Sequence, residues 1–265
     1  MRRFFGMTAT SALALTLALS LGAAASATTK HPPIHRKGAS GGSAAPIPAD
    51  ARANPFIQGN QSPPLPAGPS GKVDVIASGS LAQLIQPEGP SSLVIPVVVR
   101  NNTTKAQSGI QLTAVARNSG ELVGTGTSES NLMPLVVKPG QIAIGYVYFE
   151  SLPPTTSVIS YSVTTGNSTL GQVELTVTDS NTSPEAGGFL NLIGQVRNQT
   201  KSKIASPGSV FGICFDSTGQ PTGTLQTYTD GNSLPPGTVE PFSDQVSGDN
   251  TPCVSWLVAS NGSTL

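Results

Sequence analysis

Cysteine and histidine are the residue types most able to do chemistry, and this chain of 265 residues has two of each. Cys214 and Cys253 could form a disulfide or act as reactive thiols. A reactive or redox pair favours a CxxC spacing or an electropositive setting, and neither surrounds these residues. In an exported chain with two cysteines, a structural disulfide is the expected outcome. The bridge would close a loop of about 40 residues and stabilise the fold by about 4 kcal/mol, less any strain.

The two histidines, His31 and His35, lie in a Pro-rich stretch near the N-terminus, and the rest of the chain has none. A Ser-His-Asp or Cys-His arrangement, a histidine general base and the usual zinc site all need a histidine in the fold. Two histidines on one extended segment would bind a metal ion only loosely. We therefore expect no catalytic residue, no metal and no cofactor in the folded part.

Carboxylates are the remaining candidates for catalysis. Those able to supply a pair are Glu121, Glu129, Glu150, Glu174, Glu240, Asp216, Asp230, Asp244 and Asp249. Sugar hydrolysis by two carboxylates usually needs a cleft with aromatic platforms, and the chain has one Trp and four Tyr. Oxygen-rich stretches at 179–181, 230–232 and 248–250 lack the repeated Asp spacing of a calcium loop. Turn formation accounts for most of these acids, so we expect a protein that is not an enzyme.

The segments that must position these residues form an internal repeat, so that each occurs twice in the sequence. The segment V-R-N-N-T at 99–103 recurs as V-R-N-Q-T at 196–200, and the Pro-Gly pair at 139–140 recurs at 236–237. A repeat of about a hundred residues predicts two tandem modules, at 71–168 and 169–265, with the boundary at Asn167–Leu170. Because this connection is short, we expect the modules to contact one another. The repeated Asn101 and Asn198 begin possible glycan triplets, but they close a strand, so a backbone role is expected.

Short runs in which apolar and polar residues alternate, bounded by Gly, Pro, Asn and Asp, predict half-buried strands. In the first module they cover 73–77, 93–100, 110–116, 120–126, 132–138, 141–149 and 157–165; in the second they cover 173–178, 189–197, 209–216, 222–229, weakly 232–235, 238–246 and 253–259. Seven short strands in about 95 residues are typical of a two-sheet, immunoglobulin-like β-sandwich. The predicted fold class is therefore all-β, with two tandem sandwich domains.

The repeat also bears on the cysteines. Cys214 aligns with Val115 and Cys253 aligns with Val158, so each pair of positions is expected to be in contact within its module. On the strand that holds Cys214, the aromatic and aliphatic side chains of one face are Phe211, Ile213 and Phe215. We expect them to play the same role as Leu112, Ala114 and Ala116 in the first module. Trp256 aligns with Tyr161 and is interpreted as core filling.

Residues 1–27 read as a secretory signal peptide, with Arg2-Arg3, an apolar run and a cleavage pattern near Ala27. The twin arginines also fit a twin-arginine export signal, and the route stays open. Residues 28–70 are rich in Pro, Gly and Ser and are predicted to be a disordered tail.

We expect a bacterial protein that is secreted or loosely associated with the cell envelope, without an integral membrane segment in its mature form. Only 11% of its residues are charged, and no basic face is available for nucleic acid.

The second module resembles the FxLYD-type domain of bacterial exported proteins. Phe211, Ile213, Phe215 and Asp216 match its aromatic-x-aliphatic-aromatic-aromatic-Asp strand, with V-R-N at 196–198 upstream and Pro-Gly at 236–237 downstream. The first module keeps V-R-N at 99–101 and Pro-Gly at 139–140 but has Ala116-Arg117 in place of the aromatic-Asp pair. The resemblance implies immunoglobulin-like sandwiches on an envelope or secreted protein, without catalysis, and transfers no binding residues.

The sequence therefore favours an exported structural or interaction protein whose partner is another protein or a cell-envelope polymer. Exposed strand edges can accept an added strand, and the loops at 102–109, 199–209 and 229–236 are the expected contact regions because they differ between the modules. The alternative is an enzyme accessory or glycan-binding module, with a carboxylate hydrolase less favoured. A groove lined by Tyr146, Tyr148, Tyr228 or Trp256 would support the glycan hypothesis.

Overall fold

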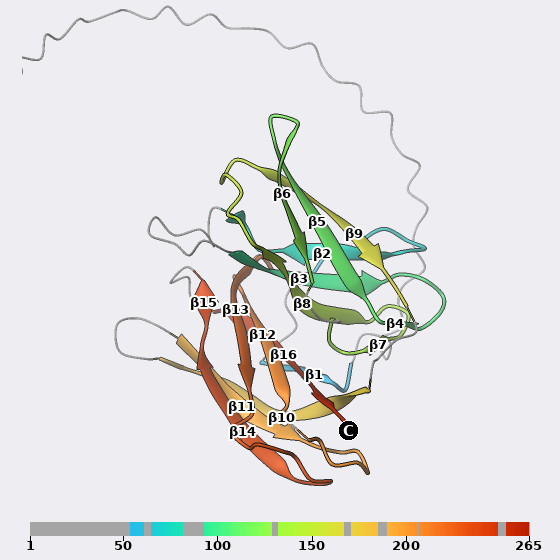
Figure 1. Ribbon diagram of the computed structural model, residues 1–265, viewed down its shortest axis with the longest axis vertical. Helices are drawn as coiled ribbons and strands as arrows, with labels where there is room; N and C mark the ends of the chain where they lie inside the picture. Colours follow the sequence, from blue (N-terminus) through green and yellow to red (C-terminus); the bar gives the residue numbers. More distant parts are fainter. Residues whose placement is uncertain are drawn as a thin grey trace, which may run out of the picture. The chain divides into compact units, whose positions relative to one another are not determined.

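The computed structural model describes residues 54–60, 65–81, 93–128, 132–166, 171–184, 190–205, 207–248 and 253–264. Every named element in these ranges is a β-strand (Figure 1), and the sheets pack against one another, which confirms the all-β, sandwich-like class. The predicted signal peptide, residues 28–53 of the predicted tail and the boundary at 167–170 lie outside the described residues. Within the described ranges, no helix is long and apolar enough to cross a membrane.

The first half of the fold is a six-stranded sheet in the order β2-β3-β8-β6-β5-β9. Its strands are β2 (Val73–Ser78), β3 (Leu93–Asn101), β5 (Gln111–Asn118), β6 (Glu121–Thr127), β8 (Ile142–Phe149) and β9 (Val158–Thr164); β4 (Gln107–Ser108) pairs separately with β7 (Val136–Val137). Because β6 joins β8 through only Gly126↔Phe149 and Thr127↔Tyr148, the sheet can fold over at that point. The buried side chains of β3, β5 and β8 then share one hydrophobic core.

The second half is built from strands β10 to β16, in the order β14-β11-β10-β16-β12-β13-β15. They are β10 (Gln172–Pro184), β11 (Leu190–Arg197), β12 (Ser209–Phe215), β13 (Pro221–Tyr228), β14 (Val239–Gln245), β15 (Ser247–Gly248) and β16 (Ser255–Ser263). Residues 172–175 of β10 pair with β16, whereas residues 176–184 pair with β11, with a bulge between Val177 and Asp179. β10 therefore changes partner between Leu175 and Thr176, around a second core, and the bulge bends the strand just beyond that point.

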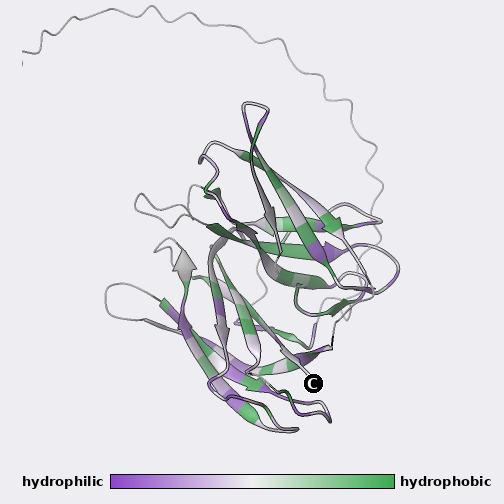
Figure 2. Ribbon diagram, in the orientation of Figure 1, coloured by the Kyte–Doolittle hydropathy of each residue, from purple (hydrophilic) through white to green (hydrophobic). Residues whose placement is uncertain are grey.

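Most strands lie within two residues of a predicted run, but three runs are wrong in their bounds. β10 continues to Pro184, so 179–181 is strand rather than turn, and β16 continues to Ser263. Within the run 132–138, only Val136–Val137 forms a strand, which is β7. The weakest predicted run, 232–235, forms no strand and contributes only the bridge between Leu234 and Ile204. Figure 2 shows hydrophobic residues lying along the strands of both halves. The continuous run at 97–99 stands out because β3 is buried on both faces, and a strand covered on both sides lacks the polar half of the alternation.

A third hydrophobic cluster explains this double burial, because it lies between the two halves. From the first half it includes Val98, Met133, Ile144 and Tyr146; from the second half it includes Phe211, Ile213, Phe215, Leu257 and Ala259. Hydrogen bonds cross the same boundary: the Gln226 amide donates to the Tyr146 hydroxyl at 2.9 Å, and the Val136 N–H donates to the Glu174 carboxylate at 3.0 Å. The expected contact between the halves is therefore present.

One prediction for β12 is wrong, and the error is a single residue. Ala116 pairs with Gly124, and Cys214 pairs with Gly223, so Cys214 is the counterpart of Ala116 rather than of Val115. The segment from Cys214 to Gly223 is one residue longer than the segment from Ala116 to Gly124, which shifts the sequence alignment. A one-residue shift moves every side chain to the opposite face. Phe211, Ile213 and Phe215 therefore point away from their own core and form the contact with the first half.

The predicted tail is ordered near its end. Ile57–Gly59 forms β1, which pairs with residues 257–259 of β16, and this part of the segment is therefore not disordered. The side chain of Asn60 continues the pairing, because it donates to the Val254 carbonyl at 3.1 Å and accepts from the Trp256 N–H at 3.0 Å. A Cβ added to Gly59 would lie 2.2 Å from the Trp256 carbonyl oxygen, so only glycine allows this close approach.

Candidate functional site

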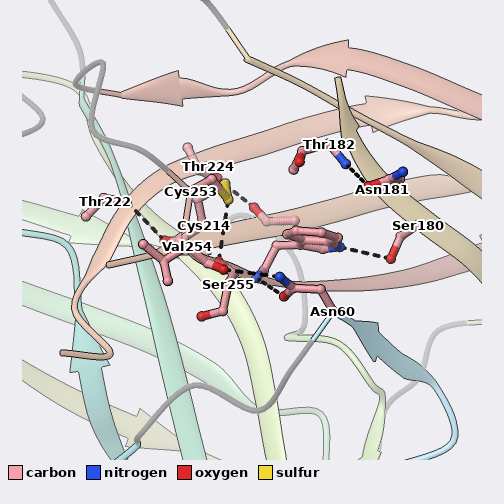
Figure 3. Close-up of a disulfide and its surroundings, with 12 residues drawn as sticks. Asn60, Ser180, Asn181, Thr182, Cys214, Thr222, Thr224, Cys253, Val254 and Ser255 are labelled. Atoms are coloured by element: carbon pink, nitrogen blue, oxygen red, sulfur yellow. Dashed lines mark hydrogen bonds between the residues drawn. A yellow bond between two sulfur atoms is a disulfide. The ribbon is translucent and has the colours of Figure 1, made fainter. Parts of the chain in front are cut away.

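The two cysteines form the predicted disulfide. Cys214 on β12 and Cys253, just before β16, are 39 residues apart in sequence and their Cα atoms are 5.0 Å apart. The bridge lies beside the point where Asn60 reaches β16 (Figure 3). Trp256 is buried at 7% exposure in the same core, as predicted, and its indole N–H donates to the Ser180 hydroxyl at 3.1 Å. This region ties strands together and carries no free thiol among the described residues.

The valine comparison that led to this pair does not hold. Val158 pairs with Arg117 and is 73% exposed, whereas Val115 pairs with Ser160. Val115 and Val158 are therefore not the counterparts of a bridged pair. The disulfide lies where the second half departs from the first, and the correct pairing follows from there being only two cysteines in the sequence.

Each repeated asparagine holds a loop in place by side-chain hydrogen bonds, and we call this hydrogen-bonded unit around Asn101 or Asn198 a staple. Asn198 is fully buried, and its amide donates to the carbonyls of Ser202 and Leu234, both at 2.8 Å. Its side-chain oxygen accepts from the N–H and the hydroxyl of Thr200 at 3.0 and 2.7 Å. Asn101 makes the same four bonds with Lys105, Val137 and Thr103, at 2.8, 2.7, 3.0 and 2.7 Å. The expected backbone role of both asparagines is confirmed.

The Pro-Gly turns complete each staple. The N–H of Gly237 donates to the Asn198 carbonyl at 2.7 Å, and Gly140 donates to Asn101 at the same distance. Both glycines have positive φ angles, 78° and 80°, which other residues adopt only at a cost. The V-x-N segment and the distant Pro-Gly pair therefore belong to one hydrogen-bonded unit that each half repeats.

Two of the candidate acidic residues, Asp216 and Glu174, accept hydrogen bonds from backbone N–H groups. Asp216 accepts from the N–H groups of Thr218 and Gln220, and the hydrogen bond from the Thr218 hydroxyl is the largest cause that lowers its pKa. Glu174 is half-buried, and this burial raises its pKa although the N–H groups of Val136 and Leu135 partly oppose the shift. No group of three or more His, Cys, Asp or Glu that could hold a metal occurs in the described ranges. Glu129, Asp249, His31 and His35 lie outside the described residues.

A cleft at the margin of the inter-half contact is the candidate binding site. Its first cavity has a volume of about 270 Å³ and is walled by Met133, Ile144 and Tyr146 from the first half. Phe211 and Tyr228 supply the second wall. An adjoining cavity of about 260 Å³ shares four lining residues with the first, namely Gln172, Ser209, Tyr228 and Asn261. Among the described residues, no charged side chain lines either cavity, and this lining suits an uncharged ligand.

The aromatic residues of the sequence analysis take different places around this cleft. Tyr146 is 8% exposed and stacks at a tilt on Phe211, with ring centroids 5.4 Å apart, so it forms part of the floor. Tyr228 is 60% exposed and presents its ring to solvent at the cleft. Tyr148 packs against the third cluster, and Trp256 is a core residue. Of the four aromatic residues whose groove would support the glycan hypothesis, Tyr146 and Tyr228 line the cleft, and only Tyr228 is exposed there. The burial of Tyr146 and Trp256 counts against that hypothesis.

Sequence reasoning missed the glutamines and the asparagine of the cleft. Gln172 begins β10, Gln226 lies on β13 and Asn261 lies on β16, and only the packed sheets bring them together. Of the predicted contact loops, 199–209 contributes Pro207 and Ser209 to the second cavity. No protein-family model matches this chain, and no curated protein sequence matches it either. The FxLYD resemblance therefore stays a prediction.

Proposed function

We propose that the protein is an exported, non-enzymatic interaction protein that presents two immunoglobulin-like modules to a protein or cell-envelope polymer. The Asn-centred staple of each half supports the description as two copies of one module. Their strand pairings correspond as well, since β2-β3-β8 matches β10-β11-β14 and β6-β5-β9 matches β13-β12-β16. The apolar contact between the halves makes them one scaffold, with the remaining sheet edges facing outward.

The observation that carries the binding role is the docking of β1. A segment of three residues from outside both sheets adds to β16 by backbone pairing. Added strands are a recurring mode of peptide recognition, in which the backbone supplies affinity and alternate side chains supply specificity. Strands β9 and β14 end their sheets in the described part of the chain, so their outer edges offer further places for an added strand.

The test places a photo-crosslinking amino acid at each edge in cells that produce the protein. Ser162 on β9 and Gln245 on β14 are exposed edge positions, and Thr113 on β5 is the exposed control because it pairs with a strand on each side. We expect a discrete adduct from an edge position and none from position 113. Absence of adducts at both edges would contradict the interaction role. A protein that stays inside the cell with its N-terminal segment uncleaved would contradict export.

A further inference from the structure

The cleft between the halves has the chemistry of a saccharide site rather than that of an accidental gap. Its floor is aromatic and aliphatic, from Tyr146, Phe211 and Ile144, and its margin carries the amides of Gln172, Gln226 and Asn261. Ligand pockets commonly combine an apolar lining with a few placed polar groups that fix orientation. Primary amides offer both a donor and an acceptor, which matches the paired hydroxyl groups of a sugar ring.

One amide of the cleft holds an unused hydrogen-bonding atom. The side-chain oxygen of Gln172 is buried and accepts no hydrogen bond, although Gln172 lines both cavities. A buried acceptor without a donor is a cost to the fold, and such atoms are uncommon in native structures. A hydroxyl group of a ligand, reached by rotation of this amide, would remove that cost.

The exposed ring of Tyr228 supplies the second requirement. An amphipathic aromatic side chain that is 60% exposed at a cavity offers an apolar face on which the C–H face of a sugar can stack. The described lining residues carry no charge, which argues against an anionic ligand because a buried carboxylate or phosphate needs a paired cation. The two cavities have volumes of about 270 and 260 Å³.

We infer that this cleft binds a neutral saccharide, with Tyr228 as the stacking platform and Gln172 and Gln226 as hydroxyl-binding amides. The two adjoining cavities fit two successive rings of a chain. The inference deepens the proposed interaction function, on which it rests, by naming a ligand class for one part of the surface. It concerns a concave site and is independent of strand addition at β9 or β14.

The test uses the full chain with glucose, mannose, galactose, N-acetylglucosamine and their trisaccharides, followed by ligand-observed NMR and calorimetry. We expect saturable binding of at least one neutral sugar with millimolar affinity, and weaker binding of glucuronate. Tyr228→Ala should weaken binding by about tenfold, whereas Tyr228→Phe, which keeps the ring, should stay within about twofold of the unaltered chain. Leu122→Ala is the control, because Leu122 is 57% exposed and does not line either cavity.

A second variant separates binding from folding. Gln172→Leu removes an unsatisfied buried acceptor, so thermal stability should be kept or raised while sugar affinity falls. The inference is overturned if no neutral sugar binds up to about 20 mM, if Tyr228→Ala binds as well as the unaltered chain, or if Pro-rich peptides bind and sugars do not. The Tyr228→Ala chain is also crosslinked at positions 162 and 245. Adducts there without sugar binding would leave the interaction function standing and remove only the saccharide site.

Discussion

Replacement of Asn198 by Ala tests the hydrogen-bonded staple most directly. The side chain makes four hydrogen bonds, at 2.7 to 3.0 Å, and is fully buried. A net contribution of about 1 kcal/mol for each bond, and no water to replace the lost partners, gives an expected loss of about 3–4 kcal/mol in the free energy of unfolding. Asn101→Ala should cost a similar amount because Asn101 makes the same four bonds.

Urea unfolding followed by the fluorescence of Trp256 gives the measurement, since Trp256 is the single tryptophan and is buried in the second half. With a slope of about 2 kcal/mol/M, the midpoint for Asn198→Ala should fall by about 1.5–2 M. Lys201→Ala is the control, because Lys201 is exposed in the same loop, and it should shift the midpoint far less. A loss below about 1 kcal/mol for Asn198→Ala would refute the reasoning that these four bonds hold the loop.

Three further predictions concern the disulfide, β1 and Glu174. Reduction of the Cys214–Cys253 bridge should lower the unfolding free energy by up to about 4 kcal/mol in the chain-entropy model; an unchanged urea midpoint, or two free thiols in the native protein, would contradict this. Gly59→Val should displace β1, because a Cβ meets the Trp256 carbonyl, so the amides that β1 protects should exchange hydrogen faster than in the unaltered chain; equal exchange rates would count against it. Burial raises the pKa of Glu174 in the fold, so its ionisation disfavours the folded state, and its contribution to stability falls as the pH rises from the unfolded pKa through the folded one. Glu174→Gln should therefore gain stability relative to the unaltered chain between pH 4 and 7, and a constant difference across that range would show that burial is not the dominant cause.

The strands were largely predictable because alternation reports which face of a sheet is buried. The same signal does not say what covers the other face. Phe211, Ile213 and Phe215 alternate as a core-facing set should, and the sequence contains no mark that their partner is the other half of the chain. The extra residue between Cys214 and Gly223, which makes a sequence alignment place this set on the core face, becomes evident only from the pairing of these two residues.

The cleft and β1 could not be predicted from the sequence, for a different reason. Gln172, Gln226 and Asn261 are separated by 35 to 89 residues and lie on three strands, so their meeting depends on sheet order and on packing between the halves. Residues 57–59 have a composition typical of a tail, and three residue pairs with β16 suffice to order them because Asn60 extends the pairing. The disulfide needed no such information, since each of the two cysteines has only the other as a possible partner within the chain.

The contact between the halves is asymmetric, because it uses a different face of each half. The positions of Val98, Ile144 and Tyr146, which cover β12, correspond in the second half to Gln195, Pro241 and Ser243, all exposed. Those of Phe211, Ile213 and Phe215 correspond in the first half to Thr113, Val115 and Arg117. Neither corresponding face carries the apolar residues for a second contact of this kind, so each half has specialised one face for the other.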